Sequence, residues 1–556
     1  MSENTATGKP RVLVLGLDGA TFDLLDSWMD RGLMPNVQRL TTEGSRAVLR
    51  SVMPPVTAPA WTSFATGVRP GKHGVFDFRR RQPGQLARRF ISSRDVRAPA
   101  LWDILADAGL QTGLINVPVT YPLSERTSFA ISDMLTPSTE VQFTNPPTLY
   151  EELRPELGEY IIDAPPNHLN GRKAIAPFLD ALETCTRQRT KYIVHLLKTR
   201  EWDFAMAVFV GTDRLQHVLW DVLSGAFEIY PATSELREYK ARAERFMTLL
   251  DGMIGEILAA CPEETHVFIV SDHGFGPLRR KFRVNKWLAQ QGLLTPSRRR
   301  GRLGRLVASA DVLRLRHLAA RMLSRGKTPG SIPFWRWINW PKTKAYAASI
   351  TELGIYVNLQ GREPDGIVAP GDEYERVRDQ VLEGLRELRH PEDGRPLLTM
   401  AGRREELFEG PHLEEAPDIV YTLEDGACTA DLRLEGPLFE RASWRSGTGM
   451  HRFGGVLIAS GPSIQKAQRL PEVEIIDVAP TILSLFQMPL PYDMEGQIAE
   501  SLLTEEARRA ATQGRGEGPP PPSSRSAQGE QPGEDSPYSE EDARQVEERL
   551  RGLGYL

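Results

Sequence analysis

Six aspartate and histidine side chains lie beside apolar, strand-like runs of this sequence, and together they have the chemistry of a metal centre. Asp213 and His217 are four residues apart, so on one turn of helix they face the same side and can hold one ion. Asp272 and His273 directly follow a β-branched run, and Gly274 lets the backbone turn away. Carboxylate and imidazole donors without a thiolate suit zinc, with manganese as an alternative. The six candidate ligands are Asp18, Asp213, His217, Asp272, His273 and His451.

Thr57 is the candidate nucleophile. It lies where a loop becomes a helix, because Pro59 suits a first helical turn and residues 61–65 continue helically. A phosphate attacked there meets free backbone N–H groups at the helix N-terminus. Two metal ions about 4 Å apart bind both the attacking and the leaving oxygen of a phosphoryl transfer. Coordination to the ions makes a threonine hydroxyl an alkoxide near neutral pH, so Thr57 is also a candidate ligand.

Each of these residues also has a purely structural interpretation. A threonine or an aspartate before a helix is commonly its cap. An Asp–His pair four residues apart can be a surface pair, and a single histidine can be a hydrogen-bonded loop residue. The combination of six, each beside a buried strand of one sheet, favours the metal centre.

Buried strands that alternate with helices must position these side chains. The strand-like runs are apolar and β-branched, and long amphipathic helices at 177–199 and 239–260 separate them. This alternation predicts right-handed crossovers and a mainly parallel sheet, whose carboxyl edge is the usual place for a ligand. We therefore predict a three-layer α/β sandwich with inserted cap or lid segments. The predicted strands that carry the site lie at 11–17, 204–210, 265–270 and 455–461.

The predicted domain organisation has five parts. Residues 130–175 carry many prolines and little periodicity, so they are expected to form a cap excursion over the active-site face. The parts are a first catalytic α/β segment at 8–295, a basic amphipathic insert or lid at 296–343, a second catalytic segment at 344–505, a disordered linker at 512–539 and a C-terminal helix at 540–556. The C-terminal helix has an apolar end that can dock back or bind a partner.

The insert is strongly basic. Ten arginine and lysine residues between 296 and 327 face a single acid, Asp311, and leucines and valines lie between the charges. An aromatic group follows at 334–340. We favour a solvated helical lid, and contact with an anionic membrane surface or a polyanionic substrate is the alternative.

Composition excludes several classes of protein. A net charge of −5 over 556 residues gives no sign of a nucleic-acid-coating surface, so no specific nucleic-acid partner is predicted. Three widely spaced cysteines argue against a disulfide framework and fit a reducing compartment. The N-terminus is short and polar, and no apolar run reaches about eighteen residues. We therefore expect a cytoplasmic protein.

At these residues the sequence resembles the alkaline phosphatase superfamily, and within it the type I phosphodiesterase/nucleotide pyrophosphatase branch. The motifs that carry the resemblance are Asp18 after the first strand, Val-Thr-Ala-Pro-Ala-Trp around Thr57, the loop 67–74, the Asp213–His217 pair, Ser-Asp-His-Gly at 271–274 and His451. The resemblance covers about residues 8–500, apart from the basic insert. It implies an alkaline phosphatase-like fold, one zinc ion held by Asp213, His217 and His451, and a second held by Asp18, Asp272 and His273, with Thr57 as the bridging nucleophile.

Two departures from related patterns bear on the substrate. The phosphodiesterase branch typically has an asparagine about twenty residues after the nucleophile, where this sequence has Val-Phe-Asp-Phe at 75–78. Nucleotide specificity is therefore less well supported than hydrolysis. Sulfatases need a cysteine or serine followed by proline and arginine, which the Thr57 motif does not supply, so sulfatase activity is set aside.

These observations predict a metal-dependent hydrolase for a small-molecule phosphoester. Thr57 attacks phosphorus in line, a phosphothreonine forms, and water then displaces it. A phosphodiester or nucleotide pyrophosphate is the first substrate class, and a phosphomonoester or phosphonate is the alternative. An alternative of a different kind is a membrane-surface or partner-binding protein that acts through residues 296–340 and has a degenerate metal site.

Overall fold

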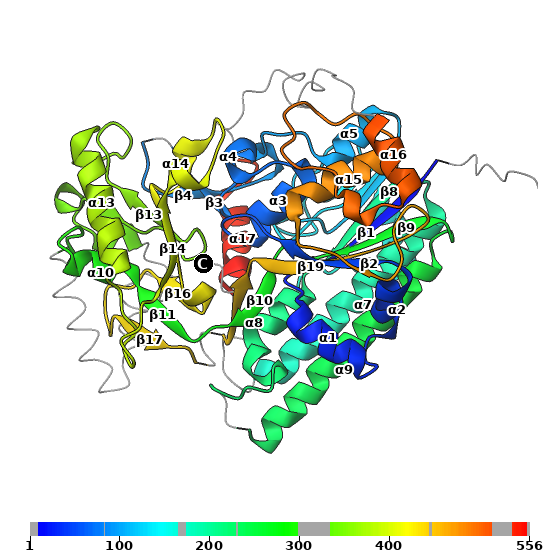
Figure 1. Cartoon of the computed structure of the whole chain (residues 1–556), viewed down its shortest axis with the longest axis horizontal. Coiled ribbons are helices and arrows are strands. Elements are labelled where there is room, and N and C mark those ends of the chain that lie inside the picture. The colour runs from blue at the N-terminus through cyan, green and yellow to red at the C-terminus, as the bar shows by residue number, and fades with distance from the viewer. Residues whose placement is uncertain are drawn as a thin grey trace, which may run out of the picture.

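The computed structural model describes residues 9–82, 84–164, 174–229, 232–297, 334–443, 447–513 and 536–552. Most of the predicted basic insert, residues 298–333, lies outside the described residues, as does most of the predicted linker, residues 514–535. Residues 165–173 of the expected cap excursion lie outside them too. Figure 1 shows a larger unit with a central sheet between helices and a smaller unit beside it, drawn in green and yellow.

A ten-stranded sheet forms the centre of the larger unit, in the order β20-β2-β19-β9-β1-β8-β5-β6-β7, with β21 beside β2. Strand β1 runs parallel to both of its neighbours, β8 and β9, and the parallel set continues through β5 and β6. Strand β19 enters antiparallel between β9 and β2. The α/β class with a mainly parallel sheet is confirmed. The strands are β1 (Arg11–Leu17), β2 (Ser45–Arg50), β5 (Thr112–Ile115), β6 (Phe129–Ile131), β7 (Thr144–Asn145), β8 (Phe204–Phe209), β9 (Thr265–Val270), β19 (Gly454–Ser460), β20 (Gln468–Arg469) and β21 (Val473–Glu474).

Helices cover both faces of this sheet (Figure 1). Side chains alternate along β1, so Leu13 and Leu15 pack with one helix layer while Val12 and Val14 pack with the other. Burial on both faces explains why β8 is apolar throughout and why β9 is apolar from Val267 to Val270. The first layer holds α1 (Phe22–Asp30), α2 (Pro35–Glu43), α6 (Leu149–Leu157), α7 (Ile175–Thr199), α8 (Gly211–Leu223) and α9 (Ser234–Ala259). The second holds α3 (Thr57–Thr66), α5 (Leu101–Asp107), α15 (Val478–Leu485), α16 (Glu505–Gln513) and α17 (Glu540–Gly552).

The smaller unit is a second sheet of seven strands with its own hydrophobic core. Its strands are β11 (Arg280–Arg283), β12 (Ala345–Tyr346), β13 (Gly354–Val357), β14 (Leu398–Arg403), β15 (Ile419–Leu423), β16 (Cys428–Asp431) and β17 (Phe439–Arg441). Helices α10 (Val284–Gln290) and α13 (Asp372–Arg386) contribute to the same core.

The bounds of this unit differ from the predicted ones. From the sequence we predicted an insert at 296–343 and a second catalytic segment that begins at residue 344. In the structure the chain leaves the central sheet after β9 and rejoins it at β19. Strands of two to six residues carry too little periodicity to show which sheet they join.

The expected cap excursion at 130–175 also differs from the structure. Within the described part of this segment, β6 and β7 extend the central sheet at its edge, and α6 packs against α7. A three-residue strand such as β6 gives no periodic signal in the sequence, although all three of its residues are buried.

Buried polar contacts join the two units. The arm formed by β3 (Arg79–Arg81) and β4 (Arg88–Phe90) reaches from the larger unit to the smaller one. Arg88 pairs with Glu352 at 2.6 Å with both side chains almost fully buried, and Arg81 pairs with Glu363 at 3.1 Å. Removing one partner of such a pair leaves an uncompensated buried charge, so these contacts fix how the units meet.

The C-terminal helix docks back onto the larger unit. Val546 and Leu550 of α17 are fully buried in the second helix layer. Arg549 donates hydrogen bonds to the backbone carbonyls of Met134 and Thr136. No helix in the described part of the chain is long and apolar enough to span a membrane.

Replacing Leu550 with alanine tests this docking. The change removes a buried side chain and leaves a cavity, so we expect the free energy of unfolding to fall by about 2–5 kcal/mol. Glu548 is exposed on the same helix, and Glu548→Ala should change that free energy by less than about 0.5 kcal/mol. Urea unfolding of the wild type and both variants measures the difference. Equal effects of the two substitutions would contradict the docked position.

Asp133 provides a pH test of the turn under α17. Its carboxylate accepts hydrogen bonds from the backbone N–H groups of Thr120 and Leu135, and burial raises its pKa to about 6. A folded pKa above the unfolded value means that protonation stabilises the fold below about pH 4 and that this contribution is lost as the pH rises through about 6. Asp133→Asn cannot ionise, so between about pH 4 and pH 7 it should gain up to about 3 kcal/mol relative to wild type. Unfolding measured across this range checks it, and a constant difference contradicts it.

Candidate metal centre

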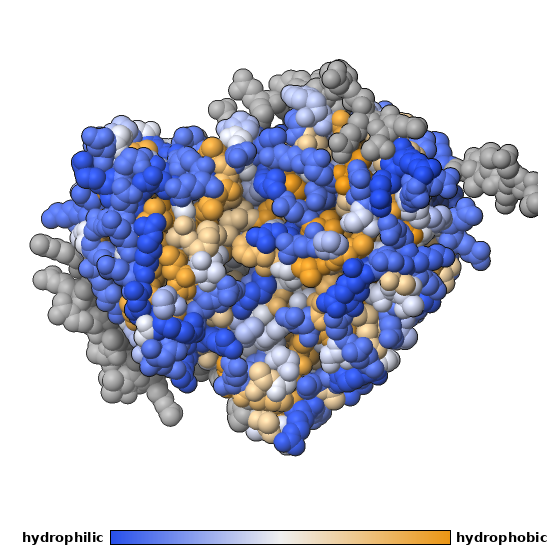
Figure 2. Space-filling view, in the orientation of Figure 1, coloured by the Kyte–Doolittle hydropathy of each residue, from blue (hydrophilic) through white to orange (hydrophobic). Residues whose placement is uncertain are grey.

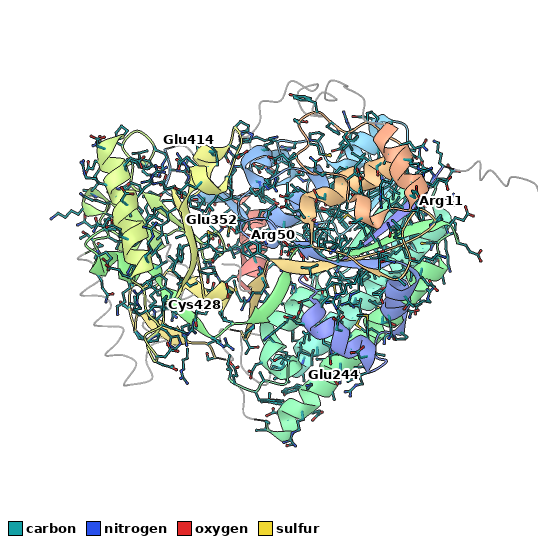
Figure 3. All side chains as sticks on the ribbon, viewed as in Figure 1. Arg11, Arg50, Glu244, Glu352, Glu414 and Cys428 are labelled. Atoms are coloured by element: carbon teal, nitrogen blue, oxygen red, sulfur yellow. The ribbon has the colours of Figure 1, made fainter. Side chains whose placement is uncertain are left out.

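The six predicted ligands lie together at the carboxyl edge of the central sheet. Asp18 follows β1, and Asp272 and His273 follow β9. Asp213 and His217 lie on α8, which begins directly after β8. Figure 3 labels Arg11, the first residue of β1, on the side away from the smaller unit, so the carboxyl end of β1 points toward that unit. The sixth residue, His451, lies on β18 (Gly449–Arg452), which pairs with β10 (Gly274–Pro277).

The structure groups these residues three and three. Asp213, His217 and His451 offer ligand atoms within 4.8 Å of one another, and so do Asp18, Asp272 and His273. The membership of the groups is the one that the resemblance implied. Their role as metal ligands remains a prediction.

The first group converges on one carboxylate oxygen. His217 Nε2 and His451 Nε2 lie 3.4 and 3.3 Å from Asp213 Oδ1. The two imidazole nitrogens lie only 2.9 Å apart. Nitrogens that each carry a lone pair repel at this distance, and a cation between them and the carboxylate resolves the repulsion. The donor set of one carboxylate and two imidazoles fits zinc.

The second group is fully buried. Asp272 Oδ2 lies 3.3 Å and Asp18 Oδ1 lies 3.7 Å from His273 Nε2. No described residue donates a hydrogen bond to Asp272 Oδ2 or makes one with His273 Nε2. Buried polar atoms are normally satisfied, so these two atoms fit a role as ligands of a cation.

Backbone carbonyls fix the orientation of all three histidines. His217 Nδ1 lies 3.2 Å from the Gly449 carbonyl, and His451 Nδ1 lies 2.9 Å from that of Pro55. His273 Nδ1 lies 3.1 Å from the Gly274 carbonyl. Anchoring through Nδ1 directs Nε2 of each ring toward the carboxylates, which is the usual arrangement in metal-binding histidines.

The electrostatics of the second group also suit a cation. Burial raises the pKa of Asp18 well above its usual value, and the charges of Asp272 and Asp213 raise it further. Burial raises the pKa of Asp272 in the same way, against the hydrogen bond from the Gly19 N–H group. Burial also acts on Asp213, but His217 and His451 outweigh it and hold the Asp213 pKa well below its usual value. Both carboxylates of the second group become stable anions only beside a positive ion.

Thr57 is the first residue of α3, where the sequence placed it, and it is completely buried beside the second group. Its hydroxyl donates to Asp18 Oδ1 at 3.5 Å. The N-terminus of an α-helix favours a bound anion, so the start of α3 suits a phosphate beside Thr57. The threonine is therefore oriented toward the second group.

Two supporting contacts were not predicted from the sequence. Trp61 donates its indole N–H to Asp18 Oδ2 at 3.0 Å. It stands four residues after Thr57 on the same helix, and that spacing was the available signal. Arg214 pairs with Asp163 at 2.6 Å, with both side chains almost completely buried, and its charge lowers the pKa of Asp18. Nothing in the sequence connects these two, because Asp163 comes from an irregular segment.

Two glycines are needed beside the ligands, for different reasons. Gly19 has φ of 67°, a conformation that suits glycine. Gly274 was expected to let the chain turn, but its role is to permit close packing. A Cβ atom there would lie 1.9 Å from the Gly454 carbonyl oxygen.

Asp77 stands near the position where the related branch has an asparagine. Both of its carboxylate oxygens accept hydroxyl hydrogen bonds, from Ser349 at 2.6 Å and Thr351 at 2.7 Å. Ser349 and Thr351 belong to the segment between β12 and β13 of the smaller unit. Asp77 therefore links the two units.

The basic loop after α3 has structural contacts. His73 is buried and accepts the Val75 N–H at Nδ1, so its Nε2–H donates to Ser63 at 2.8 Å. This direction of donation does not activate Ser63 as a nucleophile. Arg69 pairs with Glu474, and Lys72 donates to the Asp493 carbonyl.

A family comparison identifies the chain. The family model described as type I phosphodiesterase / nucleotide pyrophosphatase matches residues 12–441. The chain belongs to this family. The matched range contains Thr57 and five of the candidate ligands, while His451 lies just beyond it. A comparison of this chain with curated proteins found no match.

Solved structures of similar fold agree with the family. Murine ectonucleotide pyrophosphatase/phosphodiesterase 5, as an inactive threonine-to-alanine variant in complex with AMP, is 14% identical over 89% of this chain and 100% of its own, with a TM-score of 0.50. The human protein of that name is 14% identical over the same shares, with a TM-score of 0.49. Phosphonoacetate hydrolase from Sinorhizobium meliloti 1021 is 17% identical over 91% of this chain and 96% of its own, with a TM-score of 0.47. The likeness to the murine protein concerns the fold alone.

Metal content provides a test of the second group. His273→Gln removes a ligand, and we expect it to weaken one of the two sites more than about 100-fold. His266→Gln is the matched control, because His266 is buried at the opposite end of the same strand, near Ser463. Zinc per chain after dialysis, measured by mass spectrometry, should fall by about one ion in the first variant alone. Full zinc content in His273→Gln would contradict the assignment.

Proposed function

We propose that the protein is a metal-dependent hydrolase that cleaves phosphodiester or nucleotide pyrophosphate bonds through a phosphothreonine intermediate. The observation that carries this proposal is the position of the Thr57 hydroxyl, which lies 3.5 Å from Asp18 at the start of α3 and beside two Asp/His groups. Family membership supports the reaction class. A phosphomonoester or a phosphonate is the alternative substrate of the same machinery.

We propose two divalent metal ions as cofactors, zinc first and manganese as the alternative. Asp213, His217 and His451 would hold one ion, and Asp18, Asp272 and His273 would hold the other with Thr57. When bound, such ions lower the pKa of a hydroxyl and offset negative charge on phosphoryl oxygens. The orientation of the three histidine rings through Nδ1 and the raised pKa values of Asp18 and Asp272 support this assignment.

The residues of the chain supply the rest of the mechanism. Asp18 accepts the Thr57 hydroxyl hydrogen bond and orients its oxygen, while Trp61 holds the other oxygen of Asp18. Thr57 Oγ1 bonds to phosphorus as its proton leaves, and the bond from phosphorus to the leaving oxygen breaks. The leaving group departs as an alcohol or a phosphate after it gains a proton. Water then attacks phosphorus, breaks its bond to Thr57 and restores the hydroxyl.

Backbone N–H groups at the start of α3 would hold phosphoryl oxygens during both steps. The murine relative supports the role of a threonine, since its threonine-to-alanine form is described as inactive and as binding AMP.

We also propose a cytoplasmic location from the sequence. Contact of the insert at 296–340 with an anionic membrane stays a proposal as well, because residues 298–333 lie outside the described residues.

Thr57→Ala tests the nucleophile. With zinc or manganese present, we expect turnover of bis(4-nitrophenyl) phosphate to fall at least about 1,000-fold, because no oxygen remains to attack phosphorus. Thr57→Ser restores that oxygen and should recover part of the activity. Metal content of both variants, measured alongside, shows whether the site is intact. Unchanged turnover in Thr57→Ala would remove the assignment, whereas a preference for 4-nitrophenyl phosphate would keep the mechanism and change the substrate class.

A further inference from the structure

A cleft of about 620 Å³ lies beside the metal centre, between the larger and the smaller unit. The larger unit contributes the loop before Thr57 and the segment around Ile475, and the smaller unit contributes β14, β15 and α14 (Arg404–Leu407). Figure 2 shows apolar side chains gathered in the hollow between the two units. Figure 3 labels Arg50 at this boundary. The apolar side chains that line the cleft include Met53, Leu353, Met400, Leu407, Phe408 and Ile475.

The cleft reaches the first Asp/His group. His451 and Pro55 both line it, and the Pro55 carbonyl is the acceptor that orients the His451 ring at 2.9 Å. Pro55 stands two residues before Thr57 in the chain. A group in this cleft is therefore within reach of a phosphate held between Thr57 and His451, and can belong to the same molecule as that phosphate.

The chemistry of the walls favours an alkyl group. Methionine and leucine side chains adapt to a flexible chain, and no asparagine or glutamine is among the described residues that line the cleft. Polar side chains, among them Thr399, Thr422 and Asp425, also line the cleft, but the apolar part of its surface is the larger and is the part that suits an alkyl chain. Two arginines at the rim are already paired, Arg50 with Glu472 at 3.3 Å and Arg69 with Glu474.

We propose that this cleft binds an apolar ester arm of the substrate, so that the enzyme hydrolyses phosphodiesters carrying an alkyl or acyl chain in preference to nucleotide esters. This inference rests on the proposed function and names its substrate class. A volume of about 620 Å³ is within the range of pockets that enclose small organic ligands. Each methylene of the alkyl or acyl group that is buried in the cleft stabilises the bound substrate, and this provides the preference for such esters.

A series of 4-nitrophenyl phosphodiesters tests the inference with the zinc-loaded full chain. The second arm is methyl, butyl, octyl or thymidine, and each ester is used below the concentration at which it aggregates. We expect kcat/KM to rise about threefold per added methylene, or about 80-fold from butyl to octyl. The octyl ester should exceed the thymidine ester. Equal values for butyl and octyl, or a preference for thymidine, would overturn the inference while the proposed function stands.

Variants at Met400 locate the effect in the cleft. Met400→Asp places a charge on the wall and should abolish the gain in kcat/KM from the butyl to the octyl ester. Met400→Leu keeps an apolar side chain of similar volume and should retain the gain. A gain that survives Met400→Asp would place the alkyl chain elsewhere and overturn the inference.

Binding without turnover separates this inference from the proposed function. Octylphosphonate and methylphosphonate differ in the apolar arm, and titration calorimetry measures their affinities for the zinc-loaded chain. Tighter binding of octylphosphonate that Met400→Asp removes supports the cleft even when no ester is hydrolysed. Equal affinities overturn it. Failure to hydrolyse any ester, by contrast, contradicts the proposed function.

Discussion

The mutual repulsion of carboxylates buried at one sheet edge is the constraint on which this structure depends. Asp18, Asp213 and Asp272 are almost completely out of contact with water, and each raises the energy of charging another. The fold surrounds them with dipoles and charges that offset part of this cost: the Gly19 N–H group, the Trp61 indole and the Arg214 guanidinium. Two histidines stabilise Asp213 further. The remaining excess of negative charge fits the proposal that the site holds cations.

Backbone contacts hold the side chains of the site in place. Each histidine is anchored through Nδ1 to a backbone carbonyl, so no ring can turn its Nε2 away from the carboxylates. The anchoring carbonyls belong to the loop before α3 and to β10 and β18, which the central sheet and α8 hold in place. The smaller unit closes the remaining side through the Asp77 hydroxyl contacts and the Arg88–Glu352 pair. Both the metal centre and the cleft beside it depend on this junction.

Much of the site was predictable because local signals coincide with function. Asp18, Asp272 and His273 follow mainly apolar strands, and Asp213 and His217 share a helical turn, so local sequence signals indicate the positions of these side chains. The second sheet was not predictable, since its short strands pair across large separations. The same holds for Asp163 and Arg214, which are 51 residues apart. Contacts of this kind are set by tertiary packing, which single-sequence periodicity does not encode.

The order of strands in the central sheet has a consequence for synthesis of the protein. Strand β1, among the first residues made, lies between β8 and β9, which follow about 190 and 250 residues later. It cannot acquire both neighbours until about half of the chain has left the ribosome. His451 comes later still, and α17 fills its place in the core only at the end. The first Asp/His group is therefore completed late in translation.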